Sequence, residues 1–311
     1  MINSLTIVNY LGEKLKVTLT EADPAHGLLI KDITGIGPAD AVLNSSDYAT
    51  NDGSEPNSAR LENRSIQIIF LLTTEGNITI EQARHNAYRM FPTKKDVRLI
   101  FETDTRTVYI DGRVQRNTPA IFSDKETVTV DIKCDDPYFY KYDGASNSDS
   151  LELMAVSPAF HFESEGELET PFEVGTYGYD DSIIETINYE GEADAGFIAK
   201  IRIVGTIVGN IILSRYHTNS FFKIDLNKLL TLIDAESLST GDEIIFSTDP
   251  KHNYAKIIRN GVETNILNAV DLENSEWLLL YPGENTFVYS ISEGDDLTQL
   301  TITYKTLYQG V

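Results

Sequence analysis

The stretch "VTVDIKCDDPYFYKYDG", residues 128–144, contains a strand pattern that ends abruptly. Its first seven residues alternate apolar and polar side chains, as a half-buried strand requires. Proline has no amide hydrogen and restricts the residue before it, so the strand must end at Asp136-Pro137. We therefore predict a stiff interdomain junction made of Asp135, Asp136, Pro137, Tyr138, Phe139 and Tyr140. The alternative is an ordinary strand end whose aromatic side chains fill a core.

The composition predicts a mainly β protein of two domains. A chain of 311 residues is long for one core, and 41% hydrophobic residues supply enough apolar surface for two. The 16 tyrosines and 13 phenylalanines, with frequent Thr, Val and Ile, favour strands. We expect an N-terminal β domain with one helix over residues 1–136 and a C-terminal β-sandwich over residues 137–311. Residues 137–196 would form an acidic linker or edge region.

The net charge of -23 is distributed unevenly along the chain. Residues 1–140 hold 15 basic and 20 acidic residues, net -5, whereas residues 141–311 hold 10 and 28, net -18. This asymmetry supports two domains. It argues against direct nucleic-acid recognition through a basic surface, because phosphate contacts need clustered Lys and Arg.

One segment has a convincing helix signature. In "NITIEQARHNAYRMFP", Thr79 can cap a helix together with Gln82, apolar residues recur at helical spacing, and Pro92 ends the helix. A weaker helical pattern follows Asp225. Two further dipeptides, Asp111-Gly112 and Asn260-Gly261, suit the two-residue turn of a β-hairpin, so we expect a hairpin at each.

The segment from residue 35 to residue 60 is polar and longer than an ordinary connection. It is rich in Gly, Pro, Asn, Ser and Asp and has few apolar residues. Such a segment is expected to be mobile or to be ordered by a partner. Its candidate partner-contacting residues are Ile36, Val42, Leu43, Tyr48 and Arg60.

No catalytic or metal-binding motif is recognisable. The five histidines lack metal-ligand spacing, and there is neither a GxSxG element nor a phosphate-binding loop. Asp135-Asp136 and Asp295-Asp296 favour turn or solvated roles over a calcium site. Trp277 begins an apolar run, where a core position is commoner than a sugar-binding platform. We expect no enzyme activity, no cofactor and no metal.

The single cysteine, Cys134, excludes an internal disulfide. Its inward strand position predicts a buried thiol, suited to a reducing compartment. The first residues show no signal-peptide pattern, and no run of about 18 apolar residues occurs. We therefore expect neither secretion by a signal peptide nor membrane insertion.

Several motifs together resemble the siphophage distal tail protein (Dit) family. "VDIKCDDPYFY" is similar to the end of that family's N-terminal domain. In order and spacing, the family's C-terminal domain is resembled by "INYEGEADAGFIAKIRIVG", "LSTGDEIIFSTDPKHNYAKIIRNG", "WLLLYPGENTFVYSI" and "LTITYKTLYQGV". One departure is that the family's Gly-Asp element often continues into a run richer in aspartate, whereas "EIIF" follows here. The resemblance covers nearly the whole chain.

The resemblance implies a homo-hexameric ring at the tail tip of a virion, assembled in the host cytoplasm. Tail-tube-like N-terminal domains would form the ring, with residues 1–134 at its interface, and galectin-like C-terminal domains would lie outside it. Implied partners are the major tail tube protein, a tail-associated lysin or tail fibre protein, and a receptor-binding protein. The particle would be a phage, a prophage product or a phage-tail-like bacteriocin.

Two other functions stay open at this point. A galectin-like sandwich suggests a carbohydrate-binding module, although fold alone does not supply a sugar site. A cell-wall glycoside hydrolase is the second alternative, because 48 acidic residues make carboxylate pairs inevitable. A partly exposed tryptophan among polar side chains would favour the first, and two perturbed carboxylates facing a cleft would favour the second.

Overall fold

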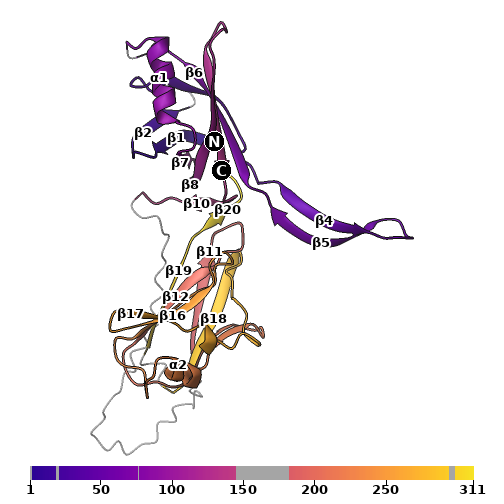
Figure 1. The fold of residues 1–311 in the computed structure, drawn as a ribbon, viewed down its shortest axis with the longest axis vertical. Helices are drawn as coiled ribbons and strands as arrows, with labels where there is room; N and C mark the ends of the chain where they lie inside the picture. Colours follow the sequence, from indigo (N-terminus) through magenta and orange to yellow (C-terminus); the bar gives the residue numbers. More distant parts are fainter. Residues whose placement is uncertain (1, 19–20, 76, 145–181, 294–297) are drawn as a thin grey trace, which may run out of the picture. The chain divides into compact units, whose positions relative to one another are not determined.

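The computed structural model describes residues 2–18, 21–75, 77–144, 182–293 and 298–311. They form two compact units, Met1–Asn147 with Leu307–Val311 and Ser148–Thr306. Both are built mainly from antiparallel strands, which confirms the predicted fold class (Figure 1). The first unit extends past the expected boundary at residue 136 and includes the last five residues of the chain. Residues 307–311 belong there because Leu307 and Tyr308 pair with the strand that follows Pro137, and the Val311 amide bonds to the Ile36 carbonyl.

The first unit is organised around one twisted antiparallel sheet. Its strand order is β2-β1-β7-β8-β9-β6-β3, and β10 joins β8 beyond the end of β9. A final short strand, β20, pairs with β10. The bounds are β1 (Ile2–Asn9), β2 (Lys14–Thr18), β3 (Leu28–Thr34), β6 (Arg64–Leu72), β7 (Asp96–Thr103), β8 (Thr107–Ala120), β9 (Thr127–Cys134), β10 (Phe139–Lys141) and β20 (Leu307–Tyr308).

The predicted helix is confirmed as α1 (Ile80–Met90), which covers one face of this sheet. Thr79 Oγ1 accepts a bond from the Gln82 amide, and the Gln82 side chain accepts one from the Thr79 amide, completing a capping box. Ala83, Ala87 and Met90 are buried in the core below the helix. The other face of the sheet carries most of its polar side chains.

The segment expected to be mobile or to be ordered by a partner contains two strands. β4 (Ala41–Asp47) and β5 (Ser54–Leu61) form a two-stranded antiparallel arm, and among the described residues they pair only with each other. In Figure 1 this arm leaves the body of the first unit. Nearly all of its side chains are exposed, so no apolar alternation marks its strands in the sequence.

The second unit is a sandwich of two antiparallel sheets, as the sequence predicts. One has the order β11-β18-β13-β14 and the other β17-β16-β15-β12-β19. Phe197 contacts Phe287 and Phe222 contacts Phe246, so aromatic rings from the two sheets meet in the core. The bounds are β11 (Ser182–Tyr189), β12 (Phe197–Ile203), β13 (Val208–Arg215), β14 (Phe221–Ile224), β15 (Glu243–Ser247), β16 (Tyr254–Arg259), β17 (Val262–Asn265), β18 (Gly283–Glu293) and β19 (Thr298–Tyr304).

The weaker helical pattern forms α2 (Leu226–Leu232) in this unit, capped by Asp225, whose side chain accepts the Lys228 amide. A 3-10 turn, η1 (Leu267–Ala269), lies beside it. The hairpin at Asn260-Gly261 is confirmed, because both residues have positive φ and join β16 to β17.

The prediction of a hairpin turn at Asp111-Gly112 is wrong, because both residues lie inside β8. The β7–β8 turn falls instead between Thr103 and Thr107. A Cβ on Gly112 would lie 2.6 Å from Ile132 Cγ2 and 2.8 Å from Cys134 Sγ. Glycine is therefore present to let two strands approach closely and not to form a turn.

Candidate functional site

The predicted junction residues lie within the first unit, at the end of β9 and in β10. Asp136 organises them: its carboxylate accepts the Tyr138 amide at 3.2 Å and the Tyr140 hydroxyl at 2.6 Å. Phe139 is fully buried and packs edge-on against Phe101, with ring centroids 5.8 Å apart. The segment thus joins the core of the first unit, while Asp135 stays exposed at the surface.

Tyr140 and Pro137 each connect the junction to another part of the unit. The Tyr140 ring stacks on Tyr109 of β8 at 5.5 Å, and the Pro137 carbonyl accepts a 2.8 Å bond from Arg64 Nε. Arg64 also lies over the Phe139 ring, 4.6 Å from its centroid. The chain after Pro137 is therefore fixed to the sheet by stacking and by a cation.

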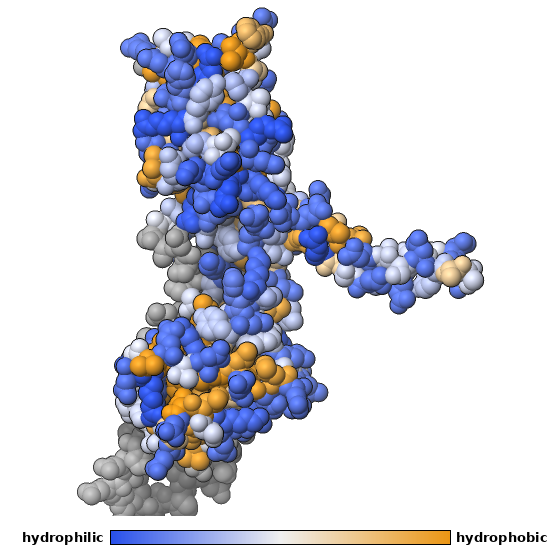
Figure 2. Space-filling view, in the orientation of Figure 1, coloured by the Kyte–Doolittle hydropathy of each residue, from blue (hydrophilic) through white to orange (hydrophobic). Residues whose placement is uncertain are grey.

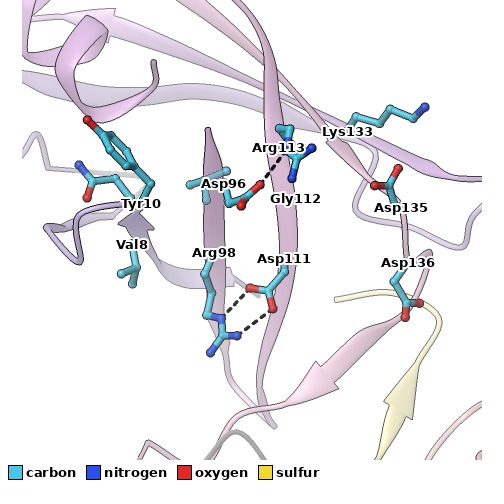
Figure 3. Close-up of a pocket in the computed structure, with 12 residues that line it drawn as sticks. Val8, Tyr10, Asp96, Arg98, Asp111, Gly112, Arg113, Lys133, Asp135 and Asp136 are labelled. Atoms are coloured by element: carbon cyan, nitrogen blue, oxygen red, sulfur yellow. Dashed lines mark hydrogen bonds and ion pairs between the residues drawn. The ribbon is translucent and has the colours of Figure 1, made fainter. Parts of the chain in front are cut away.

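An open hollow of about 620 Å³ lies beside the junction. Figure 3 shows that charged side chains of β7 and β8 line it in opposite-charge pairs. Arg98 binds Asp111 through two bonds, Nε–Oδ1 at 2.6 Å and Nη2–Oδ2 at 2.8 Å, and Arg113 Nε lies 2.7 Å from Asp96 Oδ1. Each of these two acids is engaged by an arginine, so they do not form the facing carboxylate pair that glycoside hydrolysis needs.

The hollow is part of a larger surface that we call the polar face, the side of the first sheet opposite α1. Two more ion pairs extend it: Lys16 lies 3.3 Å from Glu102, and Arg116 lies 3.8 Å from Asp131. Gln67 also donates a 2.8 Å bond to Asp131. The ion-paired side chains of this face are Lys16, Asp96, Arg98, Glu102, Asp111, Arg113, Arg116 and Asp131. The charges of these four ion pairs cancel, so the pairs make the surface hydrophilic without adding net charge to it.

The arm presents a different surface. Residues paired across its ladder share a side, so the pairs Leu43↔Ala59 and Ala41↔Leu61 create an apolar side. Leu43 is 74% exposed and shares this side with Ala41, Ala59 and Leu61, so the apolar side chains are neighbours on one surface. The opposite side carries Val42, Asn44, Ser58 and Arg60. Figure 2 shows hydrophobic residues on the arm close to the body of the unit.

The five candidate contact residues separate into four places. Leu43 lies on the apolar side of the arm, while Val42 and Arg60 face each other on its polar side. Tyr48 lies at the far turn and is 48% exposed. Ile36 lies at the root of the arm and packs partly against the core of the unit. The structure therefore brings Val42 and Arg60 together and keeps Ile36 and Tyr48 apart from them.

Nothing in the described part of the chain resembles a metal centre: no group of three His, Cys, Asp or Glu side chains could hold an ion. Asp295-Asp296 and His161 lie outside the described residues. Cys134 is fully buried, and burial raises the pKa of its thiol to about 12. No described helix is long and apolar enough to cross a membrane.

Sequence reasoning missed Arg64 and the C-terminal segment Leu307–Val311. Arg64 is only 4% exposed, and one of its bonds reaches Gln309, 245 positions away. No pattern of neighbouring residues predicts a contact between positions so far apart in the sequence. The only available signal is an arginine that begins an otherwise apolar strand.

No family model matches the chain, and no curated protein matches its sequence. In structure, the chain is similar to the SPP1 Dit protein, described as a hub of the adsorption apparatus in phages infecting Gram-positive hosts. The TM-score is 0.60 at 15% identity, over 97% of this chain and 98% of that one. The chain has the fold of a Dit protein.

The expected resemblance to Dit proteins is thereby confirmed for the fold, and it includes both units. Two structures of the phage P2 baseplate in its activated conformation, with Ca and with Sr, also align. Their TM-scores are 0.39 and 0.38, at 13% and 12% identity. They cover 100% and 96% of this chain, and 100% and 97% of their own chains.

Proposed function

We propose that this protein is a structural subunit of a phage tail tip, where copies of it form a hub ring of the baseplate. The observation that carries this proposal is the Dit fold, shared over 97% of the chain with SPP1 Dit. In the hollow, Asp111 and Asp96 are each engaged by an arginine, and no described group of His, Cys, Asp or Glu could hold a metal ion, so we assign a mechanical role rather than enzyme activity. The ring would be a homo-hexamer, in phage or phage-tail-like particles.

The arm is the element that supports ring formation. A closed ring needs head-to-tail contacts in which one surface of each subunit meets a different surface of the next. The apolar side of the arm, Ala41, Leu43, Ala59 and Leu61, is unpartnered within the described residues and lies outside the core of the unit. We infer that it packs on the first unit of a neighbouring copy, where Leu43, 74% exposed in the single chain, would bury the most apolar area.

The polar face supports the second part of the proposal, a passage through the ring. The wall of a channel through which a polyanion passes must be hydrophilic and must not bind the polyanion tightly. Surface charges that are paired with opposite charges meet both requirements. We propose that the polar face lines this passage between the major tail tube protein above and the tail-associated lysin or fibre protein below. Nucleic acid would pass this wall without being recognised.

The second unit would be the outward docking scaffold, and a receptor-binding protein is its proposed partner. Residues 141–311 carry a net charge of -18, which suits partners with basic surfaces. Such contacts associate quickly at low salt and weaken as salt screens them. The assembled site would be the tail tip of a virion built in the host cytoplasm.

The test is the mass of the full-length protein in solution, compared between two variants. Leu43→Asp places a charge on the apolar side of the arm, whereas Asn44→Asp adds the same charge to the opposite side. We expect hexamers for wild type and Asn44→Asp, and monomers for Leu43→Asp. Rings that survive Leu43→Asp would exclude the arm as the interface, and a monomeric wild type at high concentration would refute the ring.

A further inference from the structure

The root of the arm is attached to the unit through one buried cation. Arg64 donates bonds to the backbone carbonyls of three chain segments: Nη1 to Gly35 at 2.8 Å and to Gly37, Nε to Pro137 at 2.8 Å, and Nη2 to Gln309 at 2.7 Å. Charge-assisted bonds to a planar fork are strong and directional. One guanidinium thus fixes the root of the arm, the junction and the C-terminal segment relative to one another.

The C-terminal segment is held mainly through its backbone. β20 pairs with β10, and Tyr308 is 5% exposed beneath Arg106, whose guanidinium lies 4.3 Å from its ring centroid. Arg106 Nη2 donates a 3.1 Å bond to the Gly310 carbonyl. The Val311 amide donates a 3.1 Å bond to the Ile36 carbonyl. These are the contacts of an added strand, which is recognised by main-chain bonds and one buried side chain.

The same segment contacts the root of the arm directly. A Cβ on Gly310 would lie 3.1 Å from the Ile36 carbonyl oxygen, so the two backbones nearly touch. On its other side, Gly35 has φ +82, and a Cβ there would lie 2.0 Å from the Ser65 carbonyl oxygen. Residues 35–37 therefore contact β6 on one side and the C-terminal segment on another. This short stretch connects the core sheet to β4.

We propose that the first unit contains a strand-accepting site whose occupant is Leu307–Val311, and that its occupancy fixes the direction of the arm. With the segment docked, the root is held by the Val311 amide, by the close approach of Gly310, and by Arg64. When the segment is undocked, Arg64 loses its bond to the Gln309 carbonyl and the Ile36 carbonyl loses the Val311 amide. The root of the arm can then reorient about residues 35–37. The arm then samples many directions.

The site sets the order in which parts of the chain reach their final arrangement during folding. Leu307–Val311 follows the second unit in the sequence, so the arm is fixed only once that unit has been synthesised and the segment has returned. The site and its occupant belong to one chain, so the docking does not depend on whether copies form a ring.

The experiment measures the arm's direction by spin-label distances in the full-length protein. Labels go on Asn51→Cys in the arm turn and on Thr118→Cys, an exposed site in β8, while buried Cys134 stays unlabelled. Labelled chains are diluted into an excess of unlabelled protein so that only distances within one chain are read. Wild type is expected to show one narrow distance distribution.

Three variants and a control decide the outcome. Ending the chain at Tyr308 keeps β20 and three of the four Arg64 bonds. Val311→Pro removes the amide donated to Ile36 and replaces a side chain that packs partly against the core, while all four Arg64 bonds stay available. Both distributions should widen by about twofold, as local opening predicts, and Arg64→Met should widen the distribution further. Arg202→Met, an exposed arginine of β12, should change nothing. If both the shortened chain and Val311→Pro keep the narrow distribution, the proposal is wrong, even if Arg64→Met fails to fold.

Discussion

The guanidinium of Arg98 and the carboxylate of Asp111 lie side by side on neighbouring strands, joined by two bonds of 2.6 and 2.8 Å. Asp111 also raises the pKa of Arg98 through these bonds. Side chains of such pairs are partly exposed, so each contributes little to stability, about 0–1 kcal/mol. Their main consequence is electrostatic: the arginines of the polar face are not available to polyanions.

The first prediction follows from this neutralisation. The triple variant Asp96→Asn, Asp111→Asn, Asp131→Asn removes the partners of three arginines and should create a surface that binds DNA at low salt. Affinity should fall with added salt, with a logarithmic slope of about -1 per phosphate contacted. Filter binding or fluorescence anisotropy with short duplex DNA measures it, and the wild type should show no binding.

The control variant removes the same number of negative charges without breaking an ion pair of the polar face. Asp47→Asn, Asp52→Asn, Asp124→Asn also removes three negative charges, but from exposed positions on the arm and at a hairpin tip. It should not bind DNA. Equal binding by both triple variants would show that net charge, and not the pairing on the polar face, controls the interaction.

The second prediction concerns Gly112, where β8 approaches β9. Gly112→Ala places a methyl group against Ile132 and Cys134 and should lower the free energy of unfolding by about 1–3 kcal/mol, the usual cost of overpacking. Denaturant unfolding measures the loss. Gly37→Ala, where a Cβ meets nothing within 4 Å, is the matched control. A neutral Gly112→Ala would mean that β8 and β9 can separate at no cost.

The same glycine shows what the sequence could and could not predict. Asp-Gly is a turn signal because of its local φ preference, yet packing against Ile132 made the position part of a strand. The capping box at Thr79 and the Asn260-Gly261 hairpin were predictable, because local hydrogen bonds and φ values decide both. The strands of the arm could not be predicted from the sequence, because nearly all of their side chains are exposed and no apolar alternation marks them. The Arg64 contacts could not be predicted either, because they join residues up to 245 positions apart.

The third prediction is a pH effect at Glu102. The Ser4 hydroxyl, 2.8 Å away, and then Lys16, 3.3 Å away, lower the pKa of this carboxyl from its ordinary value of 4.5. A depressed folded-state pKa means that the stabilisation is present above pH 4.5 and is lost as the pH falls through the folded value. Glu102→Gln should therefore flatten the stability profile on the acid side of pH 4.5.

Thermal unfolding between pH 7 and pH 3, measured for wild type and variant, tests this difference across the range in which carboxylates titrate. Glu55→Gln, on the exposed arm, removes one acid without touching these partners and should leave the profile as in wild type. Parallel profiles for wild type and Glu102→Gln would show that the Ser4 and Lys16 contacts do not persist in solution.

The last prediction is that the second unit binds no glycan with millimolar or better affinity. A lectin site needs an aromatic platform that is open to solvent and surrounded by polar side chains. The Trp277 ring is only partly exposed and packs against Phe222, with centroids 5.0 Å apart, and Phe222 in turn stacks on Phe246 at 4.3 Å. Trp277 is thus one end of an aromatic row that continues into the sandwich core.

Removing the Trp277 ring should lower the free energy of unfolding and should not change glycan binding. Trp277→Ala is expected to lower the free energy of unfolding by about 2 kcal/mol, less than for a fully buried tryptophan because part of the ring already meets water. A glycan array and denaturant unfolding, applied to wild type and variant, separate the two effects. Millimolar or tighter binding of a defined glycan, lost in a Trp277→Ala protein that remains folded, would replace the docking scaffold with a carbohydrate-binding module.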